Sequence, residues 1–389
     1  MSGLNIVMLA PFGIRPKGTL AVRMLPLAQS LVRRGHRVSI VAPPVQNPED
    51  AGRREVLGGV RVEHTALPRR AGLTGAPELA GAMLGRVLAA SPDVLHLFKP
   101  KGYGGLAALL VRALRPALPL VVDTDDWEGW GGWNDLLPYP GAAKRLFAWQ
   151  ERDLARRAAA VTVASRTLET QVWGFGVPPS RVFYLPNGVP LERPAARAID
   201  AERATCSLLL YTRFWEFDVR DLVAALAGIA ERCPRARLVV VGRGERGEER
   251  DLLRLAARAG LAERIDYRGW LEPSAIPAVI AAADVALVPT DDTLINRARC
   301  SVKLLELMAA GLPIVASRVG QAAEYIEDGR SGVLVAPGDA GALAKAAVAL
   351  LGDASLRARL SAGAQARAAA HSWDALAPAA EQAYRRALR

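Results

Sequence analysis

Short apolar runs alternate with helical stretches along almost the whole chain, and this alternation restricts the fold more than any other feature. In the first half the runs are NIVMLAP, RVSIVAPP, RVEHTAL, DVLHLF, PLVVDT, AVTVAS and RVFYLPN. Helix-like segments such as TLAVRMLPLAQSLVRRG lie between them. Continuous apolar strands that alternate with helices are typical of a parallel sheet covered on both faces, so this half is expected to form a doubly wound domain.

The same pattern begins again after the polar, proline-containing segment NGVPLERPAARAIDAERA. The second set of runs is SLLLYT, RLVVVG, RIDYRG, VALVPT, PIVAS and GVLV. A chain of 389 residues also exceeds what one ordinary core holds, at roughly 100–200 residues per domain. We therefore predict an α/β fold of two doubly wound, Rossmann-like domains, residues 1–190 and 203–370, facing each other across a cleft with a hinge near residues 188–205.

The composition indicates a globular protein, with 51% apolar and 23% charged residues and no apolar run near the roughly 18 residues that span a bilayer. The start, MSGLNIVMLAPF, has no basic region before its apolar run and no small-residue cleavage site, so we interpret it as a first strand and expect a cytoplasmic protein. Three cysteines and four histidines are scattered, which gives neither a disulfide framework nor metal-ligand spacing.

The net charge of +11 favours anionic partners such as nucleotide phosphates, lipid headgroups or nucleic acid. However, the arginines are spread through alanine-rich helices such as LRARLSAGAQARAAA, which is typical of solvated helix faces. The chain has no RNA-recognition signature, no zinc spacing and no aromatic ladder in a basic groove. Nucleic acid is therefore not expected as a partner.

Ligands of doubly wound sheets bind at the carboxyl ends of the strands, so the loops there are candidate sites. The first such loop, PFGIRPKGTL, ends at a helix start at Gly18, where free N–H groups can bind phosphate or acceptor oxygens; a plain strand-to-helix turn is the alternative. The matching loop of the second half, YTRFWEFDVRDL, places Arg213 directly after a strand. Its guanidinium suits a diphosphate, and Arg220 could add charge; an ion pair in solvent is the alternative.

The stretch SVKLLELMAAGLPIVAS is expected to form a helix that begins at Ser301 and ends at Gly311, followed by a strand opened by Pro313. Glu306 lies in the early turns of this helix, on the loop side of the sheet, where it could accept two hydrogen bonds from a vicinal diol such as a ribose. The helix dipole alone also favours an acidic residue near the N-terminus.

The motif KLLELMAAGLPIVAS followed by GQAAEYIEDGRSGVLVAPGD resembles the nucleotide-sugar signature of GT-B enzymes of the glycosyltransferase family 4 type. The segments LAQSLVRRGHRVSIVAPP, VTVASRTLETQV and AAADVALVP are similar to the same family, so the resemblance spans nearly the whole chain. HSWDALAPAAEQAYRRAL resembles the family's terminal helix, which implies a third segment, 371–389, that crosses back to the first domain.

The resemblance implies a donor site in which Glu306 binds the ribose hydroxyls and Arg213 the diphosphate, while the backbone at residues 267–269 borders the base and residues 299–301 face the phosphates and sugar. The donor-binding residues it implies are Gly18, Arg213, Arg268, Gly269, Arg299, Ser301, Lys303, Leu305 and Glu306. It implies no metal and no other cofactor, because positive side chains and amide dipoles take up the charge of the leaving diphosphate.

Two positions depart from the family pattern. Ala298 stands where a second glutamate is usual, and Asp218 stands where a lysine follows the phosphate-binding arginine. Arg213 would then share the diphosphate with Arg220, Arg299 or Lys303. We interpret these departures as divergence within the family and not as loss of activity.

The loop VVDTDDWEGWGGWND is the most unusual stretch. Asp125 and Asp126 occupy the position of a His-Asp pair in many relatives and could bind sugar hydroxyls, orient the acceptor or act as a base. Trp127, Trp130 and Trp133 suggest platforms for a sugar ring or lipid chain, with a packed core stripe as the alternative. The catalytic candidates are Asp125, Asp126 and Arg213, and the acceptor-side candidates are Lys17, His96, Lys99, Trp127 and Trp130. For His96, which ends the strand in VLHLFKP, a packed structural histidine is the alternative.

The stretch KRLFAWQERDLARRAAA alternates apolar and basic residues at helical spacing, as in a helix lying on an anionic membrane or in an ordinary amphipathic surface helix. Together these features predict a retaining hexosyltransferase, cytoplasmic or peripheral at the inner face of the membrane, that transfers a sugar from a nucleotide diphosphate sugar to a glycan, lipid or small-molecule acceptor in cell-envelope glycoconjugate or polysaccharide synthesis. The alternatives are a nucleotide-sugar epimerase, a non-catalytic nucleotide-sugar or glycan-binding protein, and a basic membrane or nucleic-acid adaptor.

Overall fold

The computed structural model describes residues 3–15, 18–70, 72–190 and 206–389. The chain divides into two compact units. Unit 1 comprises Met1–Gly188, Ala298–Cys300 and Ser372–Arg389, and unit 2 comprises Val189–Arg297 and Ser301–His371. We predicted a hinge near residues 188–205, and residues 191–205 of this segment lie outside the described residues.

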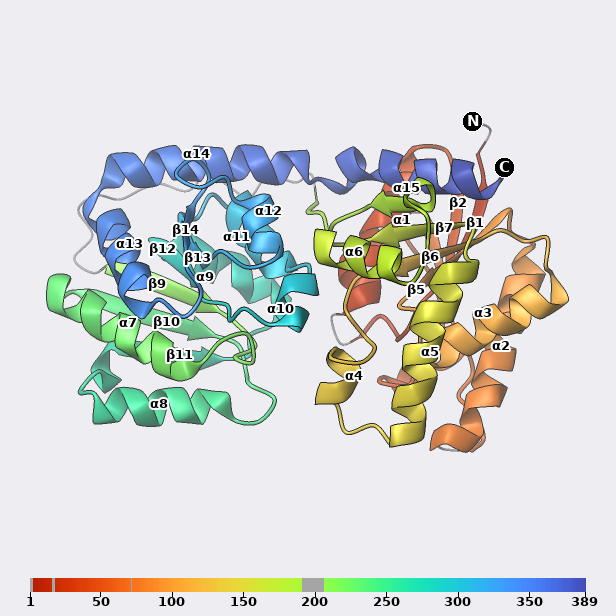
Figure 1. Cartoon of the computed structure of the whole chain (residues 1–389), viewed down its shortest axis with the longest axis horizontal. Helices are drawn as coiled ribbons and strands as arrows, with labels where there is room; N and C mark the ends of the chain where they lie inside the picture. The colour runs from red at the N-terminus through yellow and green to blue at the C-terminus, as the bar shows by residue number, and fades with distance from the viewer. Residues whose placement is uncertain (1–2, 16–17, 71, 191–205) are drawn as a thin grey trace. The chain divides into compact units, whose positions relative to one another are not determined.

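Unit 1 is built on one eight-stranded sheet in the order β3-β4-β2-β1-β5-β6-β7-β8 (Figure 1). Its strands are β1 (Asn5–Leu9), β2 (Arg37–Ala42), β3 (Arg54–Leu57), β4 (Val60–His64), β5 (Val94–Phe98), β6 (Leu120–Thr124), β7 (Ala160–Val163) and β8 (Val182–Tyr184). All neighbours pair in parallel except β3 and β4. Every residue of β5, β6 and β7 is buried, which explains why these strands read as continuous apolar runs.

The helices of unit 1 cover both faces of this sheet. They are the π-helix η1 (Leu20–Met24), α1 (Leu25–Arg33), α2 (Ala76–Ala90), α3 (Gly102–Leu114), α4 (Trp133–Leu136), α5 (Gly141–Arg157), α6 (Arg166–Gly174) and α15 (Trp373–Ala387), with 3-10 turns η2 (Pro48–Asp50), η3 (Gly72–Gly75) and η4 (Pro179–Arg181). The last helix, α15, packs against α1 and β6–β8 (Figure 1). Its Trp373 and Tyr384 are buried in the same core as β1 and α1, so the C-terminal segment is part of unit 1.

Unit 2 has a six-stranded, wholly parallel sheet in the order β11-β10-β9-β12-β13-β14 (Figure 1). The strands are β9 (Cys206–Tyr211), β10 (Ala236–Val241), β11 (Ile265–Gly269), β12 (Val285–Val288), β13 (Ile314–Ser317) and β14 (Val333–Val335). The helices are α7 (Val219–Arg232), α8 (Glu248–Arg258), α9 (Ile276–Ala282), α10 (Leu294–Ala298), α11 (Val302–Ala309), α12 (Gln321–Tyr325), α13 (Ala340–Gly352) and α14 (Ala354–Ala370), with 3-10 turns η5 (Ala262–Arg264) and η6 (Pro273–Ala275). The prediction of two doubly wound α/β domains is confirmed.

One strand was not predicted. β3 is short and alternates half-buried with exposed residues, so it lacks the apolar run that marks the other strands. It pairs antiparallel with β4 through a tight turn at Gly58 and Gly59, whose φ angles are +57° and +83°. Two consecutive positive φ angles are what a two-residue hairpin turn requires, and glycine adopts them without strain.

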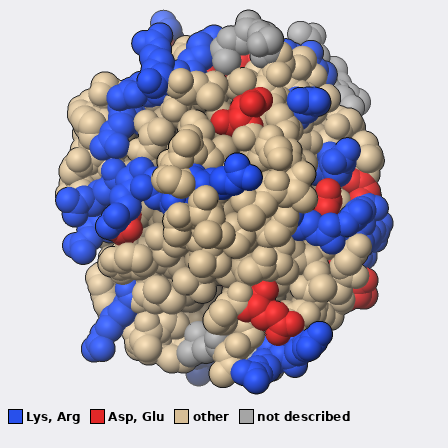
Figure 2. Space-filling model, turned by 90° about the vertical axis from the view of Figure 1, so that its right-hand side faces the viewer, with Lys and Arg blue, Asp and Glu red and all other residues tan. Residues whose placement is uncertain are grey.

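One face of unit 1 carries many basic side chains. On the face that carries α2 and α3, lysine and arginine side chains surround a broad stretch of uncharged surface, and acidic side chains are few (Figure 2). Within the described residues, no helix is both long and apolar enough to cross a membrane.

Candidate active site

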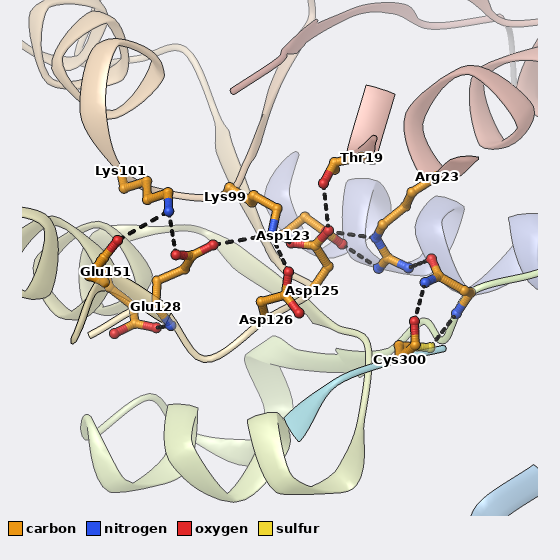
Figure 3. Close-up of polar contacts among 12 residues, drawn as sticks. Thr19, Arg23, Lys99, Lys101, Asp123, Asp125, Asp126, Glu128, Glu151 and Cys300 are labelled. Atoms are coloured by element: carbon orange, nitrogen blue, oxygen red, sulfur yellow. Dashed lines mark hydrogen bonds and ion pairs between the residues drawn. The ribbon is translucent and has the colours of Figure 1, made fainter. Parts of the chain in front are cut away.

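A cluster of charged side chains lies at the carboxyl ends of β5 and β6. Lys99 follows β5 and Asp125 and Asp126 follow β6; the two strands pair in parallel, so these ends are adjacent. The Lys99 ammonium lies 3.1 Å from Asp125 Oδ1 and 3.1 Å from Glu128 Oε1, and it also donates to Asp126 (Figure 3). The structure thus brings together three residues that the sequence singled out, Lys99, Asp125 and Asp126.

The electrostatics of this cluster follow from its burial. Burial alone would lower the pKa of Lys99, but the three carboxylates around its ammonium raise it well above the usual range. Burial raises the pKa of Asp126, against the opposing effect of Lys99. Burial also favours the protonated form of Glu128, yet Lys99 and Lys101 outweigh it and hold its pKa at about 2. Asp126 is therefore the better proton acceptor of these two carboxylates near neutral pH.

Asp125 is held from a second side by the loop after β1. Thr19, which directly precedes η1, donates from Oγ1 to Asp125 Oδ2 at 3.0 Å (Figure 3). This bond places the neighbouring Gly18 beside the acidic cluster. Lys17, an acceptor-side candidate, lies outside the described residues.

A buried network that the sequence analysis missed lies beside this cluster (Figure 3). Arg23 donates to both carboxylate oxygens of Asp123, at 2.8 and 2.6 Å, and to the carbonyl of Leu185 at 2.7 Å. It also donates to Asn187 Oδ1 at 3.0 Å, and Asn187 in turn donates to the carbonyl of Cys300 at 2.9 Å. Asp123 is fully buried and paired with Arg23, so its carboxylate holds this network together.

The prediction that His96 lies on the acceptor side is wrong, because the structure buries this residue. Its ring is fully buried, with Nδ1 2.9 Å from the Tyr384 hydroxyl and Nε2 3.3 Å from Thr162 Oγ1. Burial lowers the pKa of His96 to about 3, so the ring is neutral. It is a structural histidine that joins α15 to the sheet.

The turn after the acidic cluster determines where the tryptophans lie. Trp127 donates from Nε1 to the Trp130 carbonyl at 2.9 Å, and the Trp127 carbonyl accepts from Trp133 N at 2.8 Å. A methyl group at Gly132 would lie 2.2 Å from the Trp127 carbonyl oxygen, so only glycine fits there. Trp127 is half-buried, whereas the side chain of Trp130 is largely exposed, at 58%.

His64 and Thr65 at the end of β4 form another polar site that the sequence analysis missed. Both are buried, and neither the ring nitrogens of His64 nor Oγ1 of Thr65 has a hydrogen-bond partner among the described residues. Burial lowers the pKa of His64, against the raising effect of Asp50. Consecutive polar residues at the carboxyl end of a strand, in RVEHTAL, were the available sequence signal.

In unit 2 the loop after β9 carries Arg213 and a buried carboxylate, Glu216. Glu216 accepts from Thr212 Oγ1 at 2.9 Å and from the Arg213 backbone N–H at 3.1 Å. The Lys303 ammonium lies 3.9 Å from Glu216 Oε1 and 5.0 Å from the centre of the Tyr211 ring. The Arg213 guanidinium is half-exposed and pairs with Glu245.

Glu306 lies in the second turn of α11, which begins after β12, the neighbour of β9 in the sheet. The Ser301 side chain caps the helix by accepting from Leu304 N at 3.4 Å, and Gly311 has a φ of +68°, as the sequence predicts. Lys303 and Glu306 are three residues apart and share a helix face. Burial, and then the charge of Glu306, raises the pKa of Tyr211, which places these two side chains near each other.

The surroundings of the remaining donor-side candidates differ from one residue to the next, and the assignment of Arg268, Gly269, Arg299 and Ser301 to the donor stays a prediction. The Leu305 side chain is fully buried in the core, so it does not face a ligand site as the prediction required. Arg268 pairs with Asp266 at 2.8 Å on the surface, and Gly269, with a φ of +65°, accepts from Gly242 N at 2.8 Å. Arg299 is half-buried and belongs with Ala298–Cys300 to unit 1, whereas Ser301 belongs to unit 2.

The two departures from the family pattern have structural correlates. Asp218 caps α7 by accepting from Arg220 N at 2.9 Å, and its carboxylate also binds the Arg220 guanidinium. Ala298 is fully buried, and its carbonyl accepts from Ser165 Oγ at 2.7 Å.

In the part of the chain that the structure describes, no group of three or more histidine, cysteine or acidic side chains is placed to hold a metal ion.

Comparisons with known proteins agree with this geometry. The family model described as a glycosyl transferase 4-like domain matches residues 18–188, and the model described as glycosyl transferases group 1 matches residues 206–353. The chain is 30% identical to the 2-deoxystreptamine N-acetyl-D-glucosaminyltransferase of Streptomyces fradiae, over 87% of this chain and 83% of that protein. It is 29% identical to the phosphatidyl-myo-inositol mannosyltransferase of Mycobacterium leprae, over 93% and 92%.

Solved structures show the same fold at low sequence identity. Sucrose-phosphate synthase from Thermosynechococcus elongatus aligns with a TM-score of 0.77 at 22% identity, over 98% of both chains. The Anabaena protein HepE in complex with UDP and glucose aligns with a TM-score of 0.70 at 20% identity, over 96% of this chain and 97% of that one. From the family models, the relatives and the fold together, the chain belongs to the glycosyltransferase family 4 type of GT-B enzymes and is a glycosyltransferase.

Proposed function

We propose that the enzyme transfers a hexosyl group from a nucleotide diphosphate sugar, bound by unit 2, to a polyhydroxylated acceptor bound by unit 1. One observation carries the donor part. Lys303 on α11 lies 3.9 Å from Glu216, the carboxylate that holds the Arg213 backbone in the loop after β9, and Glu306 shares the helix face of Lys303; ligands bind at this edge of a doubly wound sheet. Two cations suit a diphosphate, and the carboxylate suits the vicinal hydroxyls of a ribose. The Anabaena structure, which contains UDP and glucose, supports this donor class.

The acceptor part rests on the cluster around Lys99. Asp125 and Asp126 offer carboxylate oxygens to hydroxyl or amino groups, while Lys99 and Thr19 fix their orientation. The named relatives act on phosphatidyl-myo-inositol and 2-deoxystreptamine, both of which contain six-membered rings with several polar substituents. We accordingly propose such a ring as the acceptor.

In the proposed reaction the bond from the anomeric carbon to the diphosphate oxygen breaks, and a bond to an acceptor oxygen forms on the same face of the sugar. The acceptor proton passes to the leaving diphosphate, so the outcome is retaining and no protein nucleophile is needed. Arg213 and Lys303 take up the charge that develops on the diphosphate, so we propose that no metal is required. Asp126, whose pKa is raised by burial, accepts a hydrogen bond from the acceptor hydroxyl.

Isothermal titration with UDP, GDP, ADP and CMP, with and without magnesium, tests the donor site. We expect one diphosphate to bind without magnesium. Arg213→Ala and Glu306→Ala should each weaken its binding about tenfold or more, because each removes a charged partner of the ligand. Glu263→Gln, a change at an exposed residue of unit 2, should leave binding unchanged. Normal binding by the Glu306 variant would refute its assignment.

Turnover assays distinguish the alternatives. A transferase releases nucleotide diphosphate only when an acceptor is present, whereas a nucleotide-sugar epimerase converts the donor without any acceptor. A non-catalytic descendant binds the donor and releases no diphosphate with any acceptor. Contact with an anionic membrane through α5 stays a prediction, which binding to anionic lipid vesicles would test.

A further inference from the structure

A pocket of about 420 Å³ lies in unit 1 between the turn after β6 and the helices α5 and α6. This volume is within the range of small-molecule sites, roughly 300–1,000 Å³. Four of the ten residues that line it are aromatic: Trp127, Trp130, Trp149 and Phe175. The side chains of Trp130 and Trp149 are both exposed. Flat aromatic faces of this kind suit the C–H face of a six-membered ring.

Two arginines on one face of α5 add positive charge to the pocket. Arg145 and Arg152 both line it, and Trp149 lies between them on the same helix face. Neither guanidinium forms an ion pair or hydrogen bond with the residues that the structure describes, whereas Arg157 of the same helix pairs with Asp153 at 2.8 Å. Two guanidiniums without partners, about 10 Å apart along the helix, are suited to oxyanions.

The inner wall of the pocket contains a polar group that still lacks a partner. The Glu151 carboxylate binds the turn after β6, where it accepts from Glu128 N at 3.0 Å and from Gly129 N at 2.9 Å. Gln171 lines the pocket and is 6% exposed. Its Nε2 lies 3.4 Å from Glu151 Oε1, but its Oε1 accepts no hydrogen bond from any described residue. A buried amide oxygen without a donor is costly, and a ligand hydroxyl would satisfy it.

We propose that this pocket binds a six-membered sugar or cyclitol ring that carries a phosphate or carboxylate group. The ring stacks on the indoles, the oxyanion pairs with Arg145 or Arg152, and a ring hydroxyl donates to Gln171 Oε1. Each of the three parts of the ligand is matched by a group that the protein leaves exposed or without a partner.

The pocket adjoins the acidic cluster through the turn that they share. Trp127 and Gly129 line the pocket, and Glu128 between them pairs with Lys99 and Lys101. Resting on the proposed function, we infer that the pocket is the part of the acceptor site that selects acceptors with an anionic ring. Binding of the anionic ring by the pocket does not itself depend on the proposed sugar transfer.

Titration calorimetry of the full chain with glucose 6-phosphate, glucuronate, glucose and inorganic phosphate tests the pocket. We expect glucose 6-phosphate and glucuronate to bind at least tenfold more tightly than glucose, and the sugar phosphate more tightly than inorganic phosphate. Arg145→Gln with Arg152→Gln should weaken sugar phosphate binding about tenfold or more. Trp149→Ala should weaken it as well. Arg156→Gln is the matched control, since this exposed arginine of α5 does not line the pocket.

Several outcomes would overturn the proposal. Equal binding of glucose and glucose 6-phosphate, or full binding by the double arginine variant, excludes the oxyanion site. Inorganic phosphate binding as tightly as the sugar phosphate excludes the ring site. Binding to phosphatidylglycerol vesicles that is lost in the double variant, without binding of soluble ring phosphates, shows a membrane headgroup contact instead.

Nucleotide diphosphate binding separates this proposal from the proposed function. The double arginine variant should bind the diphosphate like the unchanged protein, because the pocket residues belong to unit 1 and Arg213, Lys303 and Glu306 belong to unit 2. If no nucleotide binds but the sugar phosphate does, the proposed function fails and the pocket stands. If the nucleotide binds and no ring phosphate does, the pocket proposal fails alone.

Discussion

Replacing Arg23 with methionine should strongly destabilise unit 1. Arg23 and Asp123 are both fully buried, and the arginine donates to both oxygens of that carboxylate. In the variant, Asp123 keeps the hydrogen bond from Thr162 Oγ1 at 2.6 Å but loses its cation. Removing one partner of a buried ion pair costs about 3–5 kcal/mol, because a buried charge is left uncompensated. The Leu185 carbonyl also loses its donor, so we expect a loss of about 4 kcal/mol or more.

Differential scanning calorimetry measures this loss in the transition of unit 1. For a unit of roughly 200 residues each kcal/mol lowers the melting temperature by about 2–4 °C, so 4 kcal/mol corresponds to a decrease of roughly 8–16 °C. The control is Arg254→Met, which breaks an exposed pair with Asp251 in α8. Exposed pairs contribute about 0–1 kcal/mol, so this change should lower the melting temperature by less than about 4 °C.

The double variant Arg23→Met with Asp123→Leu shows whether the ion pair causes the effect. With both charges gone, no buried carboxylate is left uncompensated, and the variant should be more stable than Arg23→Met alone. A decrease below about 3 °C for Arg23→Met would refute the reasoning. So would a double variant whose loss equals the sum of the two single losses, since the residues would then not be coupled.

Three further changes test other parts of unit 1. Burial raises the pKa of Glu151 to about 7 from 4.5, so the ionisation of this group lowers the free energy of unfolding by about 2.5 kcal/mol as the pH rises from 5 to 8. Urea unfolding should show this loss, and Glu151→Gln should remove it. Lys99→Met should destabilise more at pH 8 than at pH 5, because the clustered carboxylates are costly only when ionised, and an equal loss at both pH values would contradict this. Gly132→Ala should cost about 2 kcal/mol because its methyl would lie 2.2 Å from the Trp127 carbonyl oxygen; Gly81→Ala, which meets nothing within 4 Å, is the control.

Most of the fold could be predicted because burial leaves a direct trace in the sequence. Strands covered on both faces, such as β5 and β6, have no polar alternation and read as apolar runs. Ser301 and Gly311 marked the ends of α11 because a helix cap and a left-handed turn each need a particular residue type. β3 has no apolar run that would predict it, because it is an edge strand with exposed side chains. Its conformation depends on the glycine turn and on pairing with β4.

The candidate site was predicted where polar residues follow strands and missed where partners are distant in sequence. Asp125 and Lys99 stood out at strand ends, but Glu128 did not, because its role depends on Lys101, 27 residues away. Arg23 was not singled out among the arginines of the chain. Yet Leu20, Met24 and Leu27 place it on the apolar face of its helix, and a charge in that position is a signal for a buried partner.

The Arg23 network also determines where one donor-side candidate lies. Asn187 receives a hydrogen bond from Arg23 and donates to Cys300 through both its side chain and its backbone N–H, at 2.9 and 3.0 Å. Ser165 binds the Ala298 carbonyl from the other end of the same short segment. Arg299 lies between these two anchors, so its backbone is held in unit 1. Because Ala298 is fully buried beside Ser165, a glutamate side chain there would have to displace this packing, and the alanine at this position is consistent with a segment that is anchored through its backbone.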